Sequence, residues 1–307
     1  MTAVLLAALV TTFGCAREET PAPAPAPAAP APAPEPPAEP VLDAETVLMD
    51  AAKTYFPQVA QSNNMIPSQD VMDNLDAFFI IDIRSAEDFE AGHIPGSYHS
   101  AWGQVGNIME KIPRNRPVVV ACYSGQTSGQ TVAALRMAGF DNAQSLFYGM
   151  NLGFRDRAGF EAEGTGMNAA ADLSNVSSPR NAEEEIVWDA VKAYFGRIGT
   201  EGNRLLPNQD LYDALQTNPN AFTVVDIRRK DDFDAGHIEF SQHSAWADFG
   251  NVIDTLPANR PVVVACYSGQ TSGQTVGILR VLGMDAYSLF YGVRDGWVER
   301  AGLPLVQ

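Results

Sequence analysis

The sequence contains few cysteines, few basic residues and no long apolar run. Three cysteines in 307 residues are too few for a disulfide scaffold, and they form no C-x-x-C pair that would indicate structural zinc. Lys and Arg number 20 against 37 Asp and Glu, and the net charge of −17 repels nucleic acid and anionic membrane surfaces. The four histidines lack metal-ligand spacing with a cysteine or carboxylate cluster. We therefore expect no metal, no cofactor and no nucleic-acid partner.

The N-terminal region resembles a lipoprotein signal. Residues 4–14 are apolar but too few to span a bilayer as a helix, and Cys15 follows directly, as in the lipobox of bacterial lipoproteins. We predict a signal peptide at 1–15 with lipidation of Cys15, and an extended Ala/Pro linker at 16–41. A lipid anchor would be the protein's only membrane contact. By family analogy, Ala16 favours the outer membrane, on the periplasmic side; a plain secretory signal is the alternative.

The rest of the chain is one unit written twice. The segment NRPVVVACYSGQTSGQTV occupies residues 115–132 and recurs unchanged at residues 259–276. With 46% apolar residues there is enough hydrophobic material for a core in each copy. The repeat predicts a first domain at 42–164, a linker at 165–182 and a second domain at 183–307.

Within the first unit the apolar pattern predicts an α/β fold. Residues 47–55 and 128–137 have helical spacing, whereas residues 78–83 and 117–121 are continuously apolar and rich in β-branched residues, as in buried strands. Strands of that kind alternating with helices indicate a parallel sheet covered on both faces.

A cysteine follows the second predicted strand of each unit. Cys122, like Cys266, stands at the carboxyl end of its strand, before a short polar loop and a helix. Main-chain N–H groups in such a loop and the helix dipole favour an anion, so we expect a thiolate nucleophile; an inert core cysteine is the alternative. The candidate binding loops are Tyr123, Ser124, Gly125, Gln126, Thr127 and Ser128, and Tyr267, Ser268, Gly269, Gln270, Thr271 and Ser272.

The segments IIDIRSAEDFEAGHIPGSYH, PVVVACYSGQTS and LFYGM, taken together, resemble the rhodanese (sulfurtransferase) family. The resemblance implies a five-stranded parallel sheet with helices on both faces in each of two tandem domains. It also implies a cysteine that takes sulfane sulfur from a donor such as thiosulfate, becomes a persulfide, and passes the sulfur to cyanide or a thiol. Rhodanese-like phosphatases carry a loop one residue longer that is closed by Arg. Ser128 and Ser272 stand in that place here, which favours sulfur transfer and makes persulfide or polysulfide plausible donors.

Two charged pairs end the first core strand of each unit: Asp82 with Arg84, and Asp226 with Arg228. They are interpreted as buried salt bridges that order the loops, with direct substrate contact as the alternative. His93 and His237 are expected to be hydrogen-bonding turn residues. Trp102 and Trp246 line the pocket mouth or fill the core.

Two functions remain open at this point. The first is a sulfurtransferase with one persulfide-forming cysteine in each domain; the second is a non-catalytic sulfane-sulfur carrier or docking module in periplasmic sulfur metabolism. Because each unit has a single cysteine, the acceptor must be external: a small thiol, cyanide, or a redox or sulfur-carrier protein.

Overall fold

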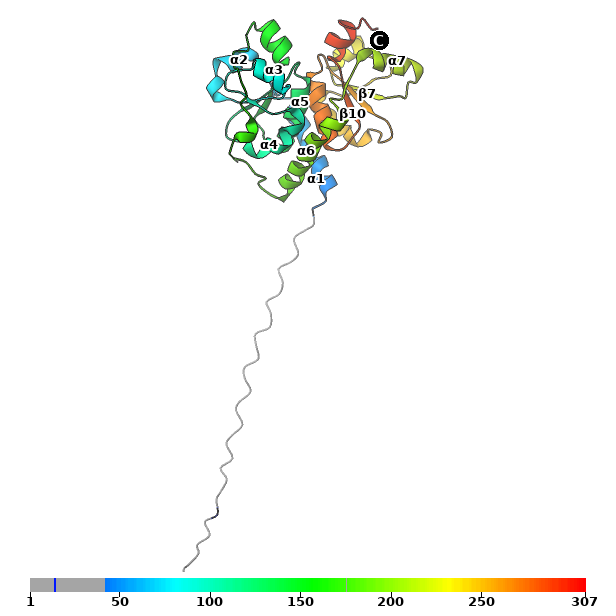
Figure 1. Cartoon of the computed structure of the whole chain (residues 1–307). Coiled ribbons are helices and arrows are strands. Elements are labelled where there is room, and N and C mark those ends of the chain that lie inside the picture. Colours follow the sequence, from blue (N-terminus) through cyan, green and yellow to red (C-terminus); the bar gives the residue numbers. More distant parts are fainter. Residues whose placement is uncertain (1–13, 15–41, 175) are drawn as a thin grey trace, which may run out of the picture. The chain divides into compact units, whose positions relative to one another are not determined.

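The computed structural model describes residue 14, residues 42–174 and residues 176–307 (Figure 1). Residues Leu42–Gln307 form one compact unit. The predicted lipidation at Cys15 and the Ala/Pro linker lie outside the described residues. Within the part of the chain that is described, no helix is long and apolar enough to cross a membrane.

The first repeat is built on a parallel sheet of five strands in the order β1-β5-β4-β2-β3. Strands β2 and β4 are entirely buried, and their residues are apolar except Asp82, which ends β2 and pairs with Arg84. The elements are α1 (Ala44–Gln58), β1 (Met65–Ile66), α2 (Ser68–Asp73), η1 (Leu75–Ala77), β2 (Phe79–Asp82), α3 (Ala86–Ala91), β3 (Tyr98–His99), η2 (Trp102–Gln104), α4 (Val105–Ile108), η3 (Met109–Lys111), β4 (Val118–Ala121), α5 (Gln126–Met137), β5 (Ala143–Leu146), the π-helix η4 (Gly149–Arg157) and η5 (Ala170–Asp172).

The second repeat has the same architecture, with a parallel sheet in the order β6-β10-β9-β7-β8. Two parallel five-stranded sheets with helices confirm the predicted fold class. The elements are α6 (Ala182–Glu201), β6 (Leu205–Leu206), α7 (Asn208–Thr217), β7 (Thr223–Asp226), α8 (Lys230–Ala235), β8 (Gln242–His243), η6 (Trp246–Asn251), η7 (Ile253–Thr255), β9 (Val262–Ala265), α9 (Gln270–Val281), β10 (Ala286–Leu289) and the π-helix η8 (Gly292–Val298).

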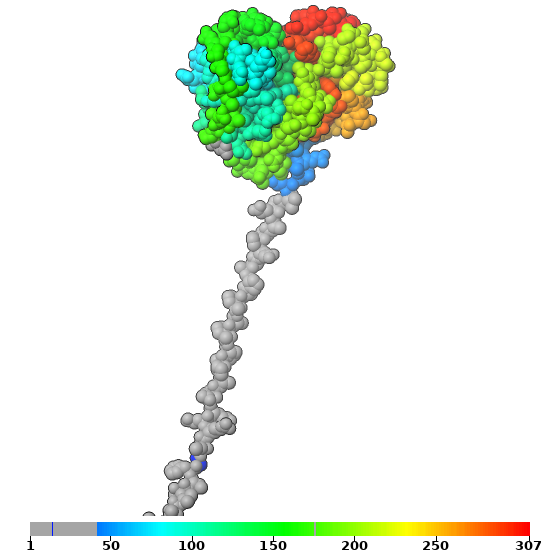
Figure 2. All heavy atoms as spheres, viewed as in Figure 1, coloured from blue at the N-terminus to red at the C-terminus, as the bar shows by residue number. Residues whose placement is uncertain are grey.

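The first helix of each repeat packs against the other repeat. Helix α1 lies against η6, and its Lys53 pairs with Asp254 of η7 at 2.6 Å. Helix α6 lies against η2 and α4, and its Lys192 pairs with Glu110 of η3 at 3.0 Å. The two exchanged helices also touch each other, and Figure 2 shows the blue surface of α1 beside the yellow-green surface of α6. Each of these two helices therefore belongs to one repeat in sequence but packs on the other repeat in the structure.

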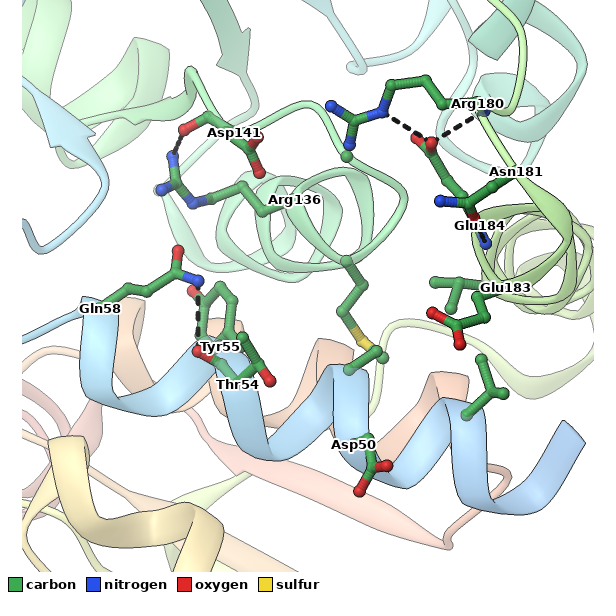
Figure 3. A pocket seen from close by; sticks show the side chains of 15 residues that line it. Asp50, Thr54, Tyr55, Gln58, Arg136, Asp141, Arg180, Asn181, Glu183 and Glu184 are labelled. Atoms are coloured by element: carbon green, nitrogen blue, oxygen red, sulfur yellow. Dashed lines mark hydrogen bonds and ion pairs between the residues drawn. The ribbon is translucent and has the colours of Figure 1, made fainter. Parts of the chain in front are cut away.

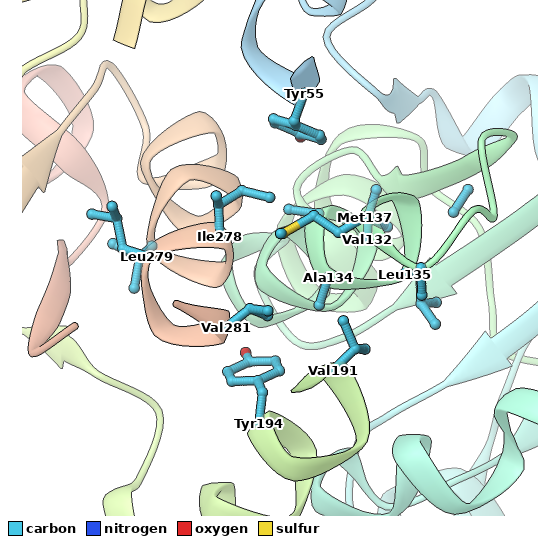
Figure 4. Close-up of a cluster of buried hydrophobic side chains, with 14 of the residues drawn as sticks. Tyr55, Val132, Ala134, Leu135, Met137, Val191, Tyr194, Ile278, Leu279 and Val281 are labelled. Carbon is cyan, nitrogen blue, oxygen red and sulfur yellow. The ribbon is translucent and has the colours of Figure 1, made fainter. Parts of the chain in front are cut away.

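Helices α5 and α9 form the centre of the molecule and make the most extensive contact between any two elements. Figure 4 shows them side by side, with Tyr55 of α1 on one flank and Tyr194 of α6 on the other. Burial raises the pKa of both tyrosines, and the Tyr55 hydroxyl donates to Gln274 Oε1 at 2.6 Å. One hydrophobic cluster spans both repeats and includes Cys122 and Cys266.

Candidate active site

Strand β4 delivers Cys122 to the carboxyl edge of the sheet, directly before helix α5. Gly125, at φ 87°, turns the chain into the helix as its N-cap, in a left-handed conformation that glycine adopts without strain. Its N–H donates to Cys122 Sγ at 3.1 Å, and Ser128 Oγ lies 3.2 Å from the sulfur. The thiol is thus held at a helix N-terminus, which is a setting that favours negative charge.

The second repeat reproduces this geometry. The Gly269 N–H donates to Cys266 Sγ at 3.1 Å, and Ser272 Oγ lies 3.3 Å from that sulfur. Both cysteines are buried and form no disulfide. The two identical sequence loops therefore place two equivalent thiols.

A second hydroxyl lies behind each cysteine. Ser145 Oγ, from β5, lies 2.7 Å from Ser128 Oγ, and Ser288 Oγ, from β10, lies 2.8 Å from Ser272 Oγ. Ser145 can also donate to the Gly125 carbonyl at 3.4 Å. If the Ser145 hydroxyl turns toward Ser128, the Ser128 hydroxyl becomes free to donate to an ionised sulfur. Neither serine was predicted from the sequence, although each begins the segment SLFYG, which occurs at residues 145–149 and 288–292.

The loop tyrosine links the cysteine loop to the helix that follows the neighbouring strand β2. The Tyr123 hydroxyl donates to Asp88 of α3 and accepts the Ser85 N–H at 3.1 Å. The hydrogen bonds from Tyr123 and Ser85 hold the pKa of Asp88 below its ordinary value. In the second repeat the Tyr267 hydroxyl donates to Asp232. This hydrogen bond is the largest cause of the lowered pKa of Asp232.

The remaining loop residues divide into two groups. Ser124 and Thr127 are partly exposed, as are Ser268 and Thr271. Gln126 and Gln270 are buried, and their side chains bond main-chain atoms of the other repeat.

The charged pairs at the strand ends are buried salt bridges. Arg84 Nε lies 3.0 Å and Nη2 lies 2.7 Å from Asp82 Oδ2, and Nη2 also donates to the Gly92 carbonyl. Arg228 makes the corresponding contacts with Asp226 and Gly236. These hydrogen bonds hold the chain that follows each strand, and the Arg228 guanidinium also lies over the ring of the loop residue Tyr267, 6.0 Å from its centroid.

The singled-out aromatic and histidine side chains have packing roles. His93 Nδ1 lies 2.7 Å from the Phe89 carbonyl and His237 Nδ1 lies 3.1 Å from the Phe233 carbonyl, each ring stacked on that phenylalanine. Trp102 and Trp246 are partly buried against the shared core. Among the described residues, no three His, Cys, Asp or Glu side chains cluster closely enough to hold a metal ion.

A cavity of about 620 Å³ lies away from both cysteines. It is bounded by α1, the C-terminal end of α5 and the start of α6, and Figure 3 shows Arg136, Tyr55 and Glu183 around it. Cys122 precedes the opposite end of α5. No cysteine lines this cavity, and the two cysteine loops are therefore taken as the candidate active sites.

Comparison with known families gives a match to each repeat. The rhodanese-like domain model matches residues 67–152 and 208–300, which include both cysteine loops. A thiosulfate sulfurtransferase of Pseudomonas savastanoi is 33% identical over 73 residues, 24% of this chain and 69% of that protein. Another, of Pseudoalteromonas translucida, is 29% identical over 88 residues, 29% of this chain and 77% of that protein.

Solved structures give more distant likenesses. A thiosulfate sulfurtransferase of Pseudomonas aeruginosa has 17% identity and a TM-score of 0.36, covering 79% of this chain and 46% of that one. The 3-mercaptopyruvate sulfotransferase SseA of Escherichia coli has 15% identity and a TM-score of 0.34, covering 74% of this chain and 97% of that one.

Proposed function

Because the chain belongs to the rhodanese-like family, we propose that it is a sulfurtransferase in which each repeat carries sulfane sulfur as a cysteine persulfide. One observation carries the proposal. In both repeats a thiol at the carboxyl end of the central strand lies 3.1 Å from a glycine N–H and close to a serine hydroxyl.

The first half-reaction loads the cysteine. The thiolate of Cys122 or Cys266 attacks the outer sulfur of thiosulfate, a Cys–S–S bond forms, and the donor S–S bond breaks with its electron pair leaving on sulfite. A polysulfide donor leaves as the shortened polysulfide in the same way. The terminal sulfur of the persulfide keeps the negative charge, which the loop N–H and hydroxyl groups stabilise as they would an oxyanion.

The second half-reaction unloads it. Cyanide attacks the terminal sulfur and leaves as thiocyanate, or a thiolate attacks it and leaves as a persulfide, and each regenerates the cysteine thiolate. Within the loops no basic side chain is present to bind the donor, so loop N–H groups and the partly exposed hydroxyls of Ser124 and Thr127, with Ser268 and Thr271 in the second repeat, would supply its polar contacts. That chemistry suits polysulfides as well as thiosulfate.

Mass measurement on the full chain tests the proposal. After incubation with thiosulfate, and separately with polysulfide, peptide mapping should find one added sulfur atom on Cys122 and one on Cys266. Replacing both, as Cys122→Ser with Cys266→Ser, should abolish loading, whereas the control Cys15→Ser should not. Absence of added sulfur on both cysteines of the wild type contradicts the proposal. Loading without repeated thiocyanate or thiol-persulfide formation would instead identify a carrier.

We also propose that the protein acts on the periplasmic side of the membrane, anchored through Cys15. The support is the apolar run at residues 4–14 that ends at that cysteine. Fatty-acid labelling of cells should mark the wild-type protein and not the Cys15→Ser variant. Equal labelling of both would contradict the anchor.

A further inference from the structure

The fourth residue after each cysteine reaches into the other repeat. Gln270 Oε1 accepts the Tyr148 N–H at 2.8 Å, and Gln126 Oε1 accepts the Tyr291 N–H at 3.2 Å. The Gln126 amide also donates to the Leu289 carbonyl at 3.4 Å. Both glutamines are almost completely buried, so water is a poor substitute for these partners.

Each glutamine bonds a turn of the other repeat, and that turn in turn bonds the cysteine carbonyl of the repeat to which the turn belongs. Tyr148 has a φ of 60°, and two residues later the Met150 N–H donates to the Cys122 carbonyl at 2.7 Å. In the second repeat, Tyr291 has a φ of 58° and the Val293 N–H donates to the Cys266 carbonyl at 2.6 Å. A left-handed conformation is costly for tyrosine and needs support from its surroundings. The other repeat's glutamine supplies part of that support.

The same glutamines also lie against the glycines whose N–H groups contact the sulfurs. A β-carbon at Gly125 would lie 2.5 Å from Gln270 Oε1, and one at Gly269 would collide with Gln126 Nε2. The Gly125 and Gly269 N–H groups are those that donate to Cys122 and Cys266. Each glutamine therefore lies against two parts of the other repeat. One is the glycine whose N–H donates to that repeat's cysteine sulfur, and the other is the turn that contacts the same cysteine's carbonyl.

We propose that Gln270 is a positioning residue for Cys122 and that Gln126 is a positioning residue for Cys266. Each catalytic loop is thus completed by the other repeat, and neither repeat holds its reactive sulfur correctly alone. The inference rests on the proposed function, because it assigns the glutamines a role in the reactivity of those two cysteines.

Site-resolved alkylation of the full chain tests the assignment. Iodoacetamide is added at fixed pH, and peptide mapping over time gives separate rates for the two cysteines in one sample. Gln126→Met has a similar volume but cannot accept the Tyr291 N–H. It should slow Cys266 by about five- to tenfold, the factor that corresponds to one net hydrogen bond, and leave Cys122 within about twofold.

A matched control lies one turn further along the same helix. Gln130 is equally buried and bonds the other repeat through Tyr194, Arg280 and Asn203, but not through the turn that clamps a cysteine. Gln130→Met should therefore leave the ratio of the two alkylation rates unchanged, whatever it does to thermal stability.

The outcomes separate this inference from the proposed function. Equal slowing of both cysteines by Gln126→Met, no change, or acceleration of Cys266 would overturn the positioning role even if the wild type loads sulfur. A shifted rate ratio in a protein that takes up no sulfur would leave the positioning role standing and remove the proposed function.

Discussion

The sulfur of Cys122 is contacted by one main-chain N–H and one hydroxyl, and the two contacts differ in how they can be tested. The Gly125 N–H belongs to the backbone and cannot be deleted by substitution, whereas the Ser128 hydroxyl can be removed. At the residue scale, Ser128 is therefore the most direct probe of how the thiolate is stabilised.

Ser128→Ala should slow sulfur loading of Cys122 by about ten- to hundredfold, because hydrogen bonds to charged groups contribute roughly 1.5–3 kcal/mol. Ser145→Ala should have a smaller effect, since Ser145 contacts Ser128 rather than the sulfur. Stopped-flow loading with thiosulfate or polysulfide, followed by peptide mapping, measures both. Cys266, in the unaltered second loop, is the internal control; an unchanged Cys122 rate in Ser128→Ala contradicts the prediction.

At the scale of elements, the start of the π-helix η4 packs directly against the main chain of the Cys122 loop. Gly149 has a φ of 62°, and a β-carbon there would lie 2.5 Å from the Cys122 carbonyl and 2.6 Å from the Ser124 nitrogen. Gly292 stands in the same relation to Cys266 and Ser268. The loop and the π-helix must therefore be placed together.

Gly149→Ala should reduce the reactivity of Cys122 by about a hundredfold, because displacement of a reacting group by about 1 Å can have an effect of that size. The matched control is Gly159→Ala. Gly159 has a φ of 70° but nothing within 4 Å of the added carbon, so it shares the backbone strain without the collision. Loading assays at Cys122 compare the two, and equal rates would contradict the prediction.

The start of α6 carries a pH-dependent contact. Burial raises the pKa of Glu184, but hydrogen bonds and charge from Arg180 and Arg114 outweigh it and leave the pKa below its ordinary value. Ionised Glu184 therefore stabilises the fold above the unfolded-state pKa of about 4.3, and the stabilisation is lost as pH falls through the lower folded value.

Glu184→Gln should lower the free energy of unfolding at neutral pH, and the difference from wild type should shrink below about pH 4. Urea unfolding at several pH values measures this. Glu183→Gln, the exposed neighbour on the same turn, is the control. A difference that persists unchanged into acid would show that the charge of Glu184 is not its cause.

At the scale of the whole molecule, the shared core couples the two repeats. Ile81 is fully buried in the cluster that spans both, and truncation of a buried isoleucine to alanine costs about 2–5 kcal/mol. Ile81→Ala should therefore lower the midpoint temperature of one unfolding transition that includes both repeats. It should not lower the midpoint of the first repeat alone. Calorimetric and van't Hoff enthalpies that agree would support this cooperative unit, and two separated transitions would contradict it.

The features that could be predicted from the sequence are those made by residues close together in the chain. The geometry of each cysteine loop is predictable because strand, cysteine, glycine and helix are consecutive, and the buried strands at 78–83 and 117–121 appear as Phe79–Asp82 and Val118–Ala121. Ser145 could not be placed, since only the pairing of β4 with β5 brings it to Ser128. Gln126 was expected in the binding loop. The sequence of two identical loops does not reveal that the side chain of each glutamine bonds main-chain atoms of the other repeat.

The exchange of α1 and α6 has a consequence for a chain cut between its halves. A proteolytic nick in residues 165–174 would leave one fragment holding α1 and the other holding α6, each seated on the opposite body. The two fragments would remain held together by these contacts, so cleavage of the chain there would not separate the two repeats.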